Sequence, residues 1–486
     1  MTFSGKIEAS DRRSPGIGES RRIYRKEVLQ MSNANQNSAL GTAPMGKLMV
    51  KMAVPAVVAQ VVNLLYNIVD RIYIGQGVGA MALTGVGLCM PLMMFMNAFA
   101  MLAGAGGAPR AAIAMGRGDK NEASKIMSNS FSLLLIFAVG ITSVYLLFAE
   151  PMLMLFGASS ETLPYSMEYM GIISWGAVFT LIVMGMNPFL TSQGFSSFAM
   201  MTTVIGAGIN IALDPIFIFT FDMGVRGAAL ATVLSQAVGA IFVLNFLTRG
   251  KKSFLRITLP AMKLEGKIVA SILTLGVSGF VMVATESLLS ISFNSSLQKF
   301  GGDLAVGSMT ILTSCIQLAQ MPASGIAQGC QPITSFNFGA GQHDRVKKCF
   351  KLQLLVAAGY TTLFWAAAML IPRVFVQMFN NDAALVEHTA WAMRIYMAGV
   401  FSLGFQLVCQ QSFVALGEAK ISLLMACLRK LILLIPLIFI LPLFFENKVM
   451  AIFLAEPISD IIAAAVTTGT FLARFDRILK NGPGGR

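Results

Sequence analysis

Residues 106–118 read Gly-Gly-Ala-Pro-Arg-Ala-Ala-Ile-Ala-Met-Gly-Arg-Gly, and residues 329–341 read Gly-Cys-Gln-Pro-Ile-Thr-Ser-Phe-Asn-Phe-Gly-Ala-Gly. Three glycines and the proline of the first stretch recur in the second at a constant offset of 223 residues. The same offset relates Gly194 in Ser-Gln-Gly to Gly417 in Ala-Leu-Gly. A constant offset across separated regions is not expected by chance, so the sequence predicts two duplicated halves.

The composition predicts an all-α membrane protein. Of the 486 residues, 56% are hydrophobic and only 12% are charged, and the mean hydropathy is +0.71. Soluble domains are about 25% charged, whereas a helix needs about 20 mostly apolar residues to cross a bilayer and satisfies its own backbone hydrogen bonds there. Twelve transmembrane helices are predicted, at 48–74, 82–107, 128–148, 167–187, 198–220, 227–247, 268–292, 305–328, 351–371, 390–415, 421–443 and 449–473.

The charges in the loops predict the orientation. Six spans separate equivalent residues, so the repeat is parallel and gives two six-helix lobes. The 36 Lys and Arg residues outnumber the 23 Asp and Glu, and most bases between spans fall on the side of the N-terminus. Basic loops are cytoplasmic, so both termini are expected in the cytoplasm and nucleic acid is not an expected partner. The predicted segments are a flexible tail 1–44, an N-terminal lobe 45–247, a basic linker 248–267, a C-terminal lobe 268–475 and a tail 476–486.

Polar residues recur in three of the predicted spans at spacings of three and four residues, which places each set on one helical face. In lipid such side chains are costly unless they face the bundle interior or a water-filled cavity. A single glutamine can simply join two helices by a hydrogen bond, but whole stripes favour a cavity that binds the substrate. The predicted cavity residues are Gln60, Asn63, Asn67, Gln317, Gln320, Gln406 and Gln410.

Three carboxylates, Asp70, Asp214 and Glu286, lie in the outer halves of predicted spans. At 1.5 Å per residue, Asp70 and Asp214 lie roughly 6–9 Å below their helix ends, at a common depth. Asn210 precedes Asp214 by one turn, and Thr232 has a similar depth. Sodium prefers oxygen ligands, and a proton requires a carboxylate whose charge is destabilised by burial. We predict an ion-coupling site here for a proton or sodium; the alternative is that each acid pairs with a nearby base such as Arg71.

Signals of catalysis are absent from the sequence. The two histidines, His343 and His388, fall in loops on opposite sides, so they cannot form one metal site or triad. No G-x-x-x-x-G-K-[ST] motif for nucleotide binding occurs. The six cysteines fall in spans or at inner helix ends and form no external disulfide framework. The chain is therefore expected to be no enzyme and to need neither a cofactor nor a resident metal.

Two long motifs resemble the multidrug and toxic compound extrusion (MATE) family, in particular its MepA-like prokaryotic branch. They are Val-Asn-Leu-Leu-Tyr-Asn-Ile-Val-Asp-Arg-Ile-Tyr-Ile-Gly at 62–75, and Asn-Ile-Ala-Leu-Asp-Pro-Ile-Phe-Ile-Phe at 210–219, which Met-Gly-Val-Arg-Gly-Ala-Ala-Leu-Ala-Thr follows at 223–232. The resemblance covers residues 45–475. It implies a V-shaped bundle in a prokaryotic cytoplasmic membrane that exports drugs, often cationic and amphipathic, against inward movement of protons or sodium.

The resemblance also implies site residues. The acid of the family's first helix, the Asn and Asp of the fifth and the hydroxyl of the sixth match Asp70, Asn210, Asp214 and Thr232. The seventh-helix acid of sodium-coupled members matches Glu286. Their tenth-helix acid is missing, because 400–415 contains no Asp or Glu, which puts a sodium site in the C-terminal lobe in doubt.

The substrate stays open at this point. The 32 methionines suit a surface that binds many shapes, and a drug-like small molecule is the expected partner of a monomer embedded in lipid. The alternative function is a flippase for lipid-linked saccharide or peptidoglycan precursors, which a groove lined by basic residues would favour. The membrane-embedded bases available for such a groove are Arg394, Arg429 and Lys430.

Overall fold

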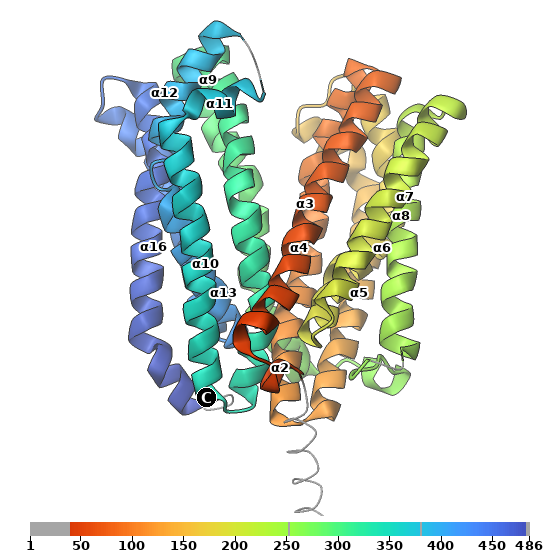
Figure 1. The fold of residues 1–486 in the computed structure, drawn as a ribbon. Coiled ribbons are helices and arrows are strands. Elements are labelled where there is room, and N and C mark those ends of the chain that lie inside the picture. The colour runs from red at the N-terminus through yellow and green to blue at the C-terminus, as the bar shows by residue number, and fades with distance from the viewer. Residues whose placement is uncertain (1–38, 251–252, 380–381, 483–486) are drawn as a thin grey trace, which may run out of the picture.

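The computed structural model describes residues 39–250, 253–379 and 382–482, and all regular elements in these ranges are helical. Two groups of helices stand side by side, close together at the end that carries α2 and the C-terminus and apart at the other end (Figure 1). One group is the N-terminal lobe. Its helices are α2 (Ala39–Thr42), α3 (Met45–Gly77), α4 (Ala80–Arg117), α5 (Lys120–Leu155), α6 (Leu163–Ser192), α7 (Ser196–Pro215), the π-helical η1 (Ile216–Thr220) and α8 (Gly224–Arg249).

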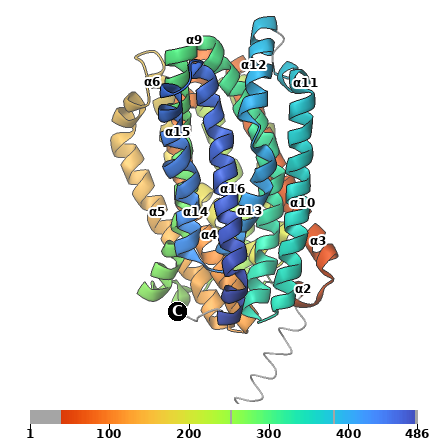
Figure 2. The same ribbon diagram turned by 90° about the vertical axis from the view of Figure 1, so that its left-hand side faces the viewer.

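The other group is the C-terminal lobe, which follows the short 3-10 helix η2 (Leu259–Met262) in the connecting segment. Seen from its outer face, α16 runs alongside the spans that contain α13 and α14 (Figure 2). The helices of this lobe are α9 (Gly266–Gly339), α10 (His343–Leu370), α11 (Pro372–Gln377), α12 (Ala383–Tyr396), η3 (Val400–Ser402), α13 (Leu403–Ala415), α14 (Ala419–Cys427), the π-helical η4 (Leu428–Leu434), α15 (Ile435–Ile440), η5 (Leu441–Leu443) and α16 (Lys448–Asn481).

The number of spans agrees with the prediction. Ten helices in the described ranges are long and apolar enough to cross a membrane, and α12 with η3 and α13 forms an eleventh span bent by 46°. The 74 residues of α9 would extend about 110 Å as one straight helix, far more than a bilayer needs. The helix reverses at Gly302, whose φ of 61° is easy only for glycine, so α9 supplies two spans. The predicted all-α fold of two repeated six-helix lobes is confirmed.

Several helices continue beyond the predicted membrane spans. The helix that contains the eighth span extends to Gly339, past residue 328, and α16 continues to Asn481, into the predicted tail. Part of the predicted flexible tail is folded: Ala39–Thr42 form α2, in which Leu40 is buried and its carbonyl accepts hydrogen bonds from the side chains of Asn337 and Arg345. The remaining part of the predicted flexible tail, residues 1–38, lies outside the described residues.

Two of the repeated glycine pairs, Gly106 with Gly329 and Gly116 with Gly339, lie where the backbones of the two lobes approach most closely. A Cβ atom added at Gly116 would lie 3.0 Å from the Cα of Gly339, and one added at Gly339 would lie 2.9 Å from the Cα of Ile113. A Cβ at Gly106 would lie 2.8 Å from the backbone nitrogen of Gly276. Only a hydrogen side chain permits such close helix crossings. We call Gly106, Gly116, Gly276, Gly329 and Gly339 the glycine seam.

Candidate functional site

A cavity of about 420 Å³ lies between the lobes. Residues from α3, α4, α6, α7, α8, α9 and α13 form its wall, which is mostly apolar and contains no charged side chain among the described residues. Its volume is in the range of pockets that bind drug-sized molecules. The larger polar and methionine side chains of the wall are Gln60, Asn63, Tyr66, Met101, Met184, Asn187, Met200, Gln236, Met282, Gln328, Gln331 and Gln411.

The structure places two of the seven predicted cavity residues, Gln60 and Asn63, in this wall. The Nε2 of Gln60 donates to the Oε1 of Gln328 at 3.2 Å, a hydrogen bond that joins the two lobes. Asn67 lies one turn beyond the wall, and its amide donates to the carbonyl of Asn63 at 2.6 Å.

The other four lie outside the wall. Gln317 is exposed and Gln320 is half-buried, both on the part of α9 nearer Gly302. Gln406 and Gln410 are buried within α13, where the Nε2 of Gln410 donates to the Oγ of Ser422 at 3.1 Å. The neighbouring Gln411 faces the cavity in their place. Successive residues of a helix differ by about 100° in direction. Gln406 and Gln410 therefore point into the C-terminal lobe, while the adjacent Gln411 points into the cavity.

Four of the five predicted ion-coupling residues come together in the N-terminal lobe. Asp70 of α3 and Asp214 of α7 are buried, and their carboxyl groups are close enough to interact directly. The Nδ2 of Asn210 donates to the Oδ1 of Asp214 at 3.3 Å and to the Oγ1 of Thr232 at 3.4 Å. Arg71, the alternative partner of Asp70, is exposed. The four residues that helical phase and depth had grouped thus lie together, and their role in ion coupling stays a prediction.

Three oxygens of this cluster have no hydrogen-bond partner among the described residues. They are buried, and belong to Asp70 (Oδ1), Asn210 (Oδ1) and Asp214 (Oδ2). Buried polar atoms are nearly always satisfied, so these oxygens are available to accept a hydrogen bond or to coordinate a cation. Two neighbouring carboxylates also repel each other when both are charged. The arrangement can therefore bind one proton, or a small cation that prefers oxygen ligands.

The cluster borders the cavity on three helices. Tyr66, Ala207 and Ser235 line the cavity. Asp70, Asn210 and Thr232 follow or precede them by a single turn on α3, α7 and α8. Directly after Asp214, Pro215 removes a backbone donor, and the chain continues as the π-helix η1. Short π-helical segments often mark functional positions because they locally change the direction of side chains.

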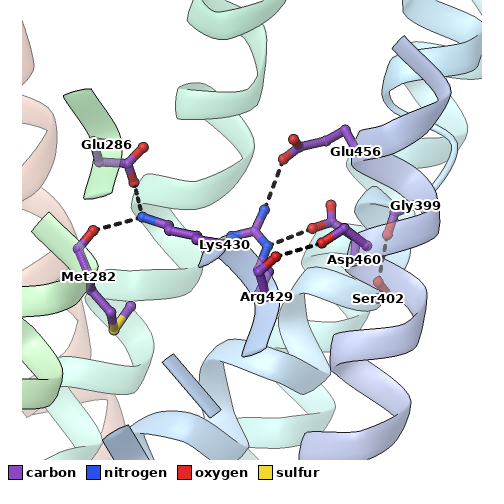
Figure 3. Close-up of polar contacts among 9 residues, drawn as sticks. Met282, Glu286, Gly399, Ser402, Arg429, Lys430, Glu456 and Asp460 are labelled. Carbon is purple, nitrogen blue, oxygen red and sulfur yellow. Dashed lines mark hydrogen bonds and ion pairs between the residues drawn. The ribbon is translucent and has the colours of Figure 1, made fainter. Parts of the chain in front are cut away.

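Glu286, the fifth predicted ion-coupling residue, lies apart from this cluster. It forms an ion pair with Lys430 of η4, inside the C-terminal lobe (Figure 3). The sequence reasoning left the roles of Arg429 and Lys430 open and missed Glu456 and Asp460, with which Arg429 pairs. A signal for them was present, because two acids four residues apart within the last apolar span require partners in lipid.

Twelve membrane spans in two repeated lobes, with a mainly apolar cavity between them and buried acids beside it, define a membrane transport protein. The comparison with known families agrees with this class. The family model MatE matches residues 55–216 and again residues 279–440. The chain belongs to the MatE family, and it is a transporter and not an enzyme.

Known relatives cover most of the chain. It is 24% identical over 428 residues to the multidrug export protein MepA of Staphylococcus aureus, covering 87% of this chain and 94% of the relative. MepA of Staphylococcus haemolyticus is 23% identical over 419 residues, covering 86% and 92%. A crystal structure of MATE in the bent conformation has a TM-score of 0.85 at 25% identity, covering 94% and 99%. A MOP superfamily transporter from Pyrococcus furiosus, described as having reverse polarity of its binding pocket, has a TM-score of 0.85 at 26% identity, covering 91% and 98%.

Proposed function

We propose that this protein is a cation-coupled antiporter that exports amphipathic, cationic drugs or toxic compounds across the cytoplasmic membrane of a prokaryote. The observation that carries the proposal is the set of three unpaired buried oxygens of Asp70, Asn210 and Asp214, one helical turn from the cavity. A proton or sodium ion bound there relieves the repulsion between the two acids. Because the site borders the cavity, ion and substrate can influence each other's binding through the same helices.

The polarity of the cavity supports a cationic substrate. Its wall holds methionines, amides and apolar residues. The acids Asp70 and Glu286 lie within one turn of the wall along their helices, and the bases Lys51 and Arg110 lie within one turn of it on the side of the termini. Met-rich walls adapt to many shapes. The multidrug export relatives point the same way.

The flippase alternative loses its main support. That function needs basic groups free to bind phosphates, but Arg429 pairs with Glu456 and Asp460, and Lys430 pairs with Glu286. Arg394 is exposed near the end of α12. Arg429 and Lys430 thus face acids in the C-terminal lobe, which does not favour an anionic headgroup beside them.

Transport would follow from alternating access of a monomer with both termini in the cytoplasm. The lobes meet at the glycine seam, on the termini side of the cavity. Opening this seam while the opposite ends approach would move the cavity's access from one side of the membrane to the other. A bound ion can drive that change only if it prefers one of the two arrangements, since equal affinity for both shifts nothing.

The test uses the purified protein in lipid vesicles with ethidium as the probe and a proton or a sodium gradient imposed separately. One of the gradients is expected to drive ethidium transport, and Asp214→Asn is expected to abolish it, because the amide keeps the shape of the acid but neither titrates nor carries charge. Glu150→Gln, which changes an exposed acid of α5, is the matched control and should transport normally. Near-normal transport by Asp214→Asn would refute the assignment and direct attention to Glu286.

A further inference from the structure

A second group of charged side chains lies in the C-terminal lobe where α9, η4 and α16 meet, and all of its members except Glu286 are buried (Figure 3). The Nε of Arg429 donates to the Oδ1 of Asp460 at 2.6 Å, and its Nη2 donates to the Oε1 of Glu456 at 3.0 Å. Lys430 pairs with Glu286 and also donates to the carbonyl of Met282 at 2.7 Å. We call these five side chains, Glu286, Arg429, Lys430, Glu456 and Asp460, the C-lobe cluster.

The charges of the C-lobe cluster do not balance. Three acids and two bases give a net charge of −1 when all five are ionised. Lys430 and Glu286 compensate each other, so the surplus falls on Arg429, which faces two carboxylates alone. The side chains of Glu456 and Asp460 are 6% and 0% exposed. An uncompensated charge so far from water is strongly unfavourable.

One atom of the cluster can accept a proton that would neutralise the surplus negative charge. The Oδ2 of Asp460 is buried and has no hydrogen-bond partner among the described residues. Tyr396 of α12 is a further titratable side chain that faces the two acids. We propose that the C-lobe cluster is a second proton-binding site, in which Glu456 and Asp460 share one proton beside Arg429.

The geometry fits a proton better than a metal ion. The guanidinium of Arg429 already occupies one oxygen of each acid. The Oγ of the neighbouring Ser459 donates to the carbonyl of Arg429 at 2.8 Å. A sodium or calcium ion needs a shell of several oxygens at short range, and the described residues contain no group of three or more His, Cys, Asp or Glu side chains suited to a metal. A single proton on one acid restores neutrality without any further ligand.

The cluster lies on helices equivalent to those of the N-terminal site. The N-terminal acids and their partners lie on α3, α7 and α8. With the offset of 223 residues, the equivalent helices are the first half of α9, the span containing η4, and α16, which are the helices that carry the C-lobe cluster. Both sites also have a π-helical segment nearby, η1 in one lobe and η4 in the other. The lobes thus hold different charged residues on equivalent helices, with the C-lobe cluster one to two turns nearer the side of the termini.

The cluster also reaches the cavity. Met282, whose carbonyl accepts from Lys430, is part of the cavity wall, and Glu286 follows it by one turn with 49% of its side chain exposed. A cationic substrate near Glu286 would compete with Lys430 for this acid. Release of Lys430 toward Glu456 would then lower the tendency of the two inner acids to hold their proton. This consequence for transport rests on the function proposed above, whereas proton binding itself does not.

Infrared spectroscopy of the full chain in lipid tests proton binding directly, because the C=O stretch of a protonated carboxyl is separate from that of a carboxylate. The background is Asp70→Asn with Asp214→Asn, which removes the N-terminal acids. We expect one protonated carboxyl per molecule at neutral pH, and its band should vanish in Glu456→Gln and equally in Asp460→Asn. Either amide leaves one acid for one guanidinium, so the cluster is balanced and needs no proton.

The control is Glu387→Gln, which changes an exposed acid of α12 and should leave the band intact. Absence of the band in the background, or its persistence in either Glu456→Gln or Asp460→Asn, would overturn the proposal. Vesicle transport with Asp460→Asn in the otherwise unaltered chain is expected to move one proton fewer per exported ethidium. If unaltered protein moves no ethidium while the infrared result holds, the antiport proposal fails and the proton site stands.

Discussion

The glycine seam gives the sharpest test of how the lobes move. In Gly116→Ala, the new methyl group would lie 2.9 Å from the backbone nitrogen of Ala340 and 3.0 Å from the Cα of Gly339. The backbone carbonyl oxygen of Phe336 is closer still, and since non-bonded heavy atoms prefer separations of about 3.5–4.0 Å, the two helices must part by roughly an ångström or more. The obstructing atoms belong to backbone and cannot rotate away as a side chain could.

The size of the effect follows from this overlap. Overpacking a tightly packed contact costs about 1–3 kcal/mol. The alanine destabilises the conformation in which the lobes touch at the seam and leaves the conformation in which they are separated unaffected. The equilibrium should therefore shift toward seam opening by about 5- to 150-fold.

The shift can be measured as access to the cavity from the side of the termini. Ala112 lines the cavity close to the seam, and a cysteine at this position in a cysteine-free background serves as the probe. Gly116→Ala should speed its reaction with an impermeant thiol reagent by the factor given above. Gly140→Ala is the matched control, since a Cβ added at Gly140 on α5 meets nothing within 4 Å. Equal labelling rates in Gly116→Ala and Gly140→Ala would refute the view that the seam is the closed gate.

Three further outcomes are expected. Thr232→Val removes an acceptor of the Asn210 amide, a loss of about 1 kcal/mol, so the concentration of coupling ion for half-maximal transport should rise roughly fivefold; an unchanged value would exclude a supporting role. Arg429→Gln leaves two buried acids without their base and should lower the melting temperature of the purified protein strongly, at a cost of about 3–5 kcal/mol; a melting temperature equal to that of the unaltered protein would contradict the pairing. An impermeant thiol reagent added outside cells should label Ser160→Cys and not Lys120→Cys, and the reverse pattern would invert the proposed orientation.

Most of the fold could be predicted from the sequence because it depends on two features that the sequence shows directly, the apolar spans and the internal repeat. Apolar length predicts each span independently, and the repeat offset relates the halves without any knowledge of contacts. Span ends were less accurate, as at Gly339, because helices extend past the bilayer wherever another helix covers them. The residues of the N-terminal cluster could be grouped from the sequence because Asp70 and Asp214 are acids within apolar spans, at a common depth in the membrane, and Asn210 lies on the same helical face as Asp214.

The remaining parts of the site depend on which helix faces which. A stripe of glutamines on α13 looks the same in sequence whether it turns toward a cavity or toward its own lobe, and only packing distinguishes Gln410 from Gln411. The C-lobe cluster was missed for a related reason. The sequence places Arg429 and Lys430 in an apolar span but does not show their partners. Those partners are acids of α9 and α16, which only the fold brings into contact with them.

The contacts of the glycine seam are symmetric between the two halves of the chain, which bears on how the chain arose. Gly116 approaches Gly339, its own counterpart in the other half, and a Cβ on each would meet the backbone of residues 336 and 113, which are counterparts as well. Gly106 against Gly276 is mirrored by Gly329 against Ala53 in the same way. Contacts of residue i with j and of j with i are the mark of an isologous interface in a symmetric dimer. The seam is thus the fused form of a self-complementary surface, the kind of surface through which a single six-helix ancestor could pair with an identical copy of itself before gene duplication joined the two into one chain.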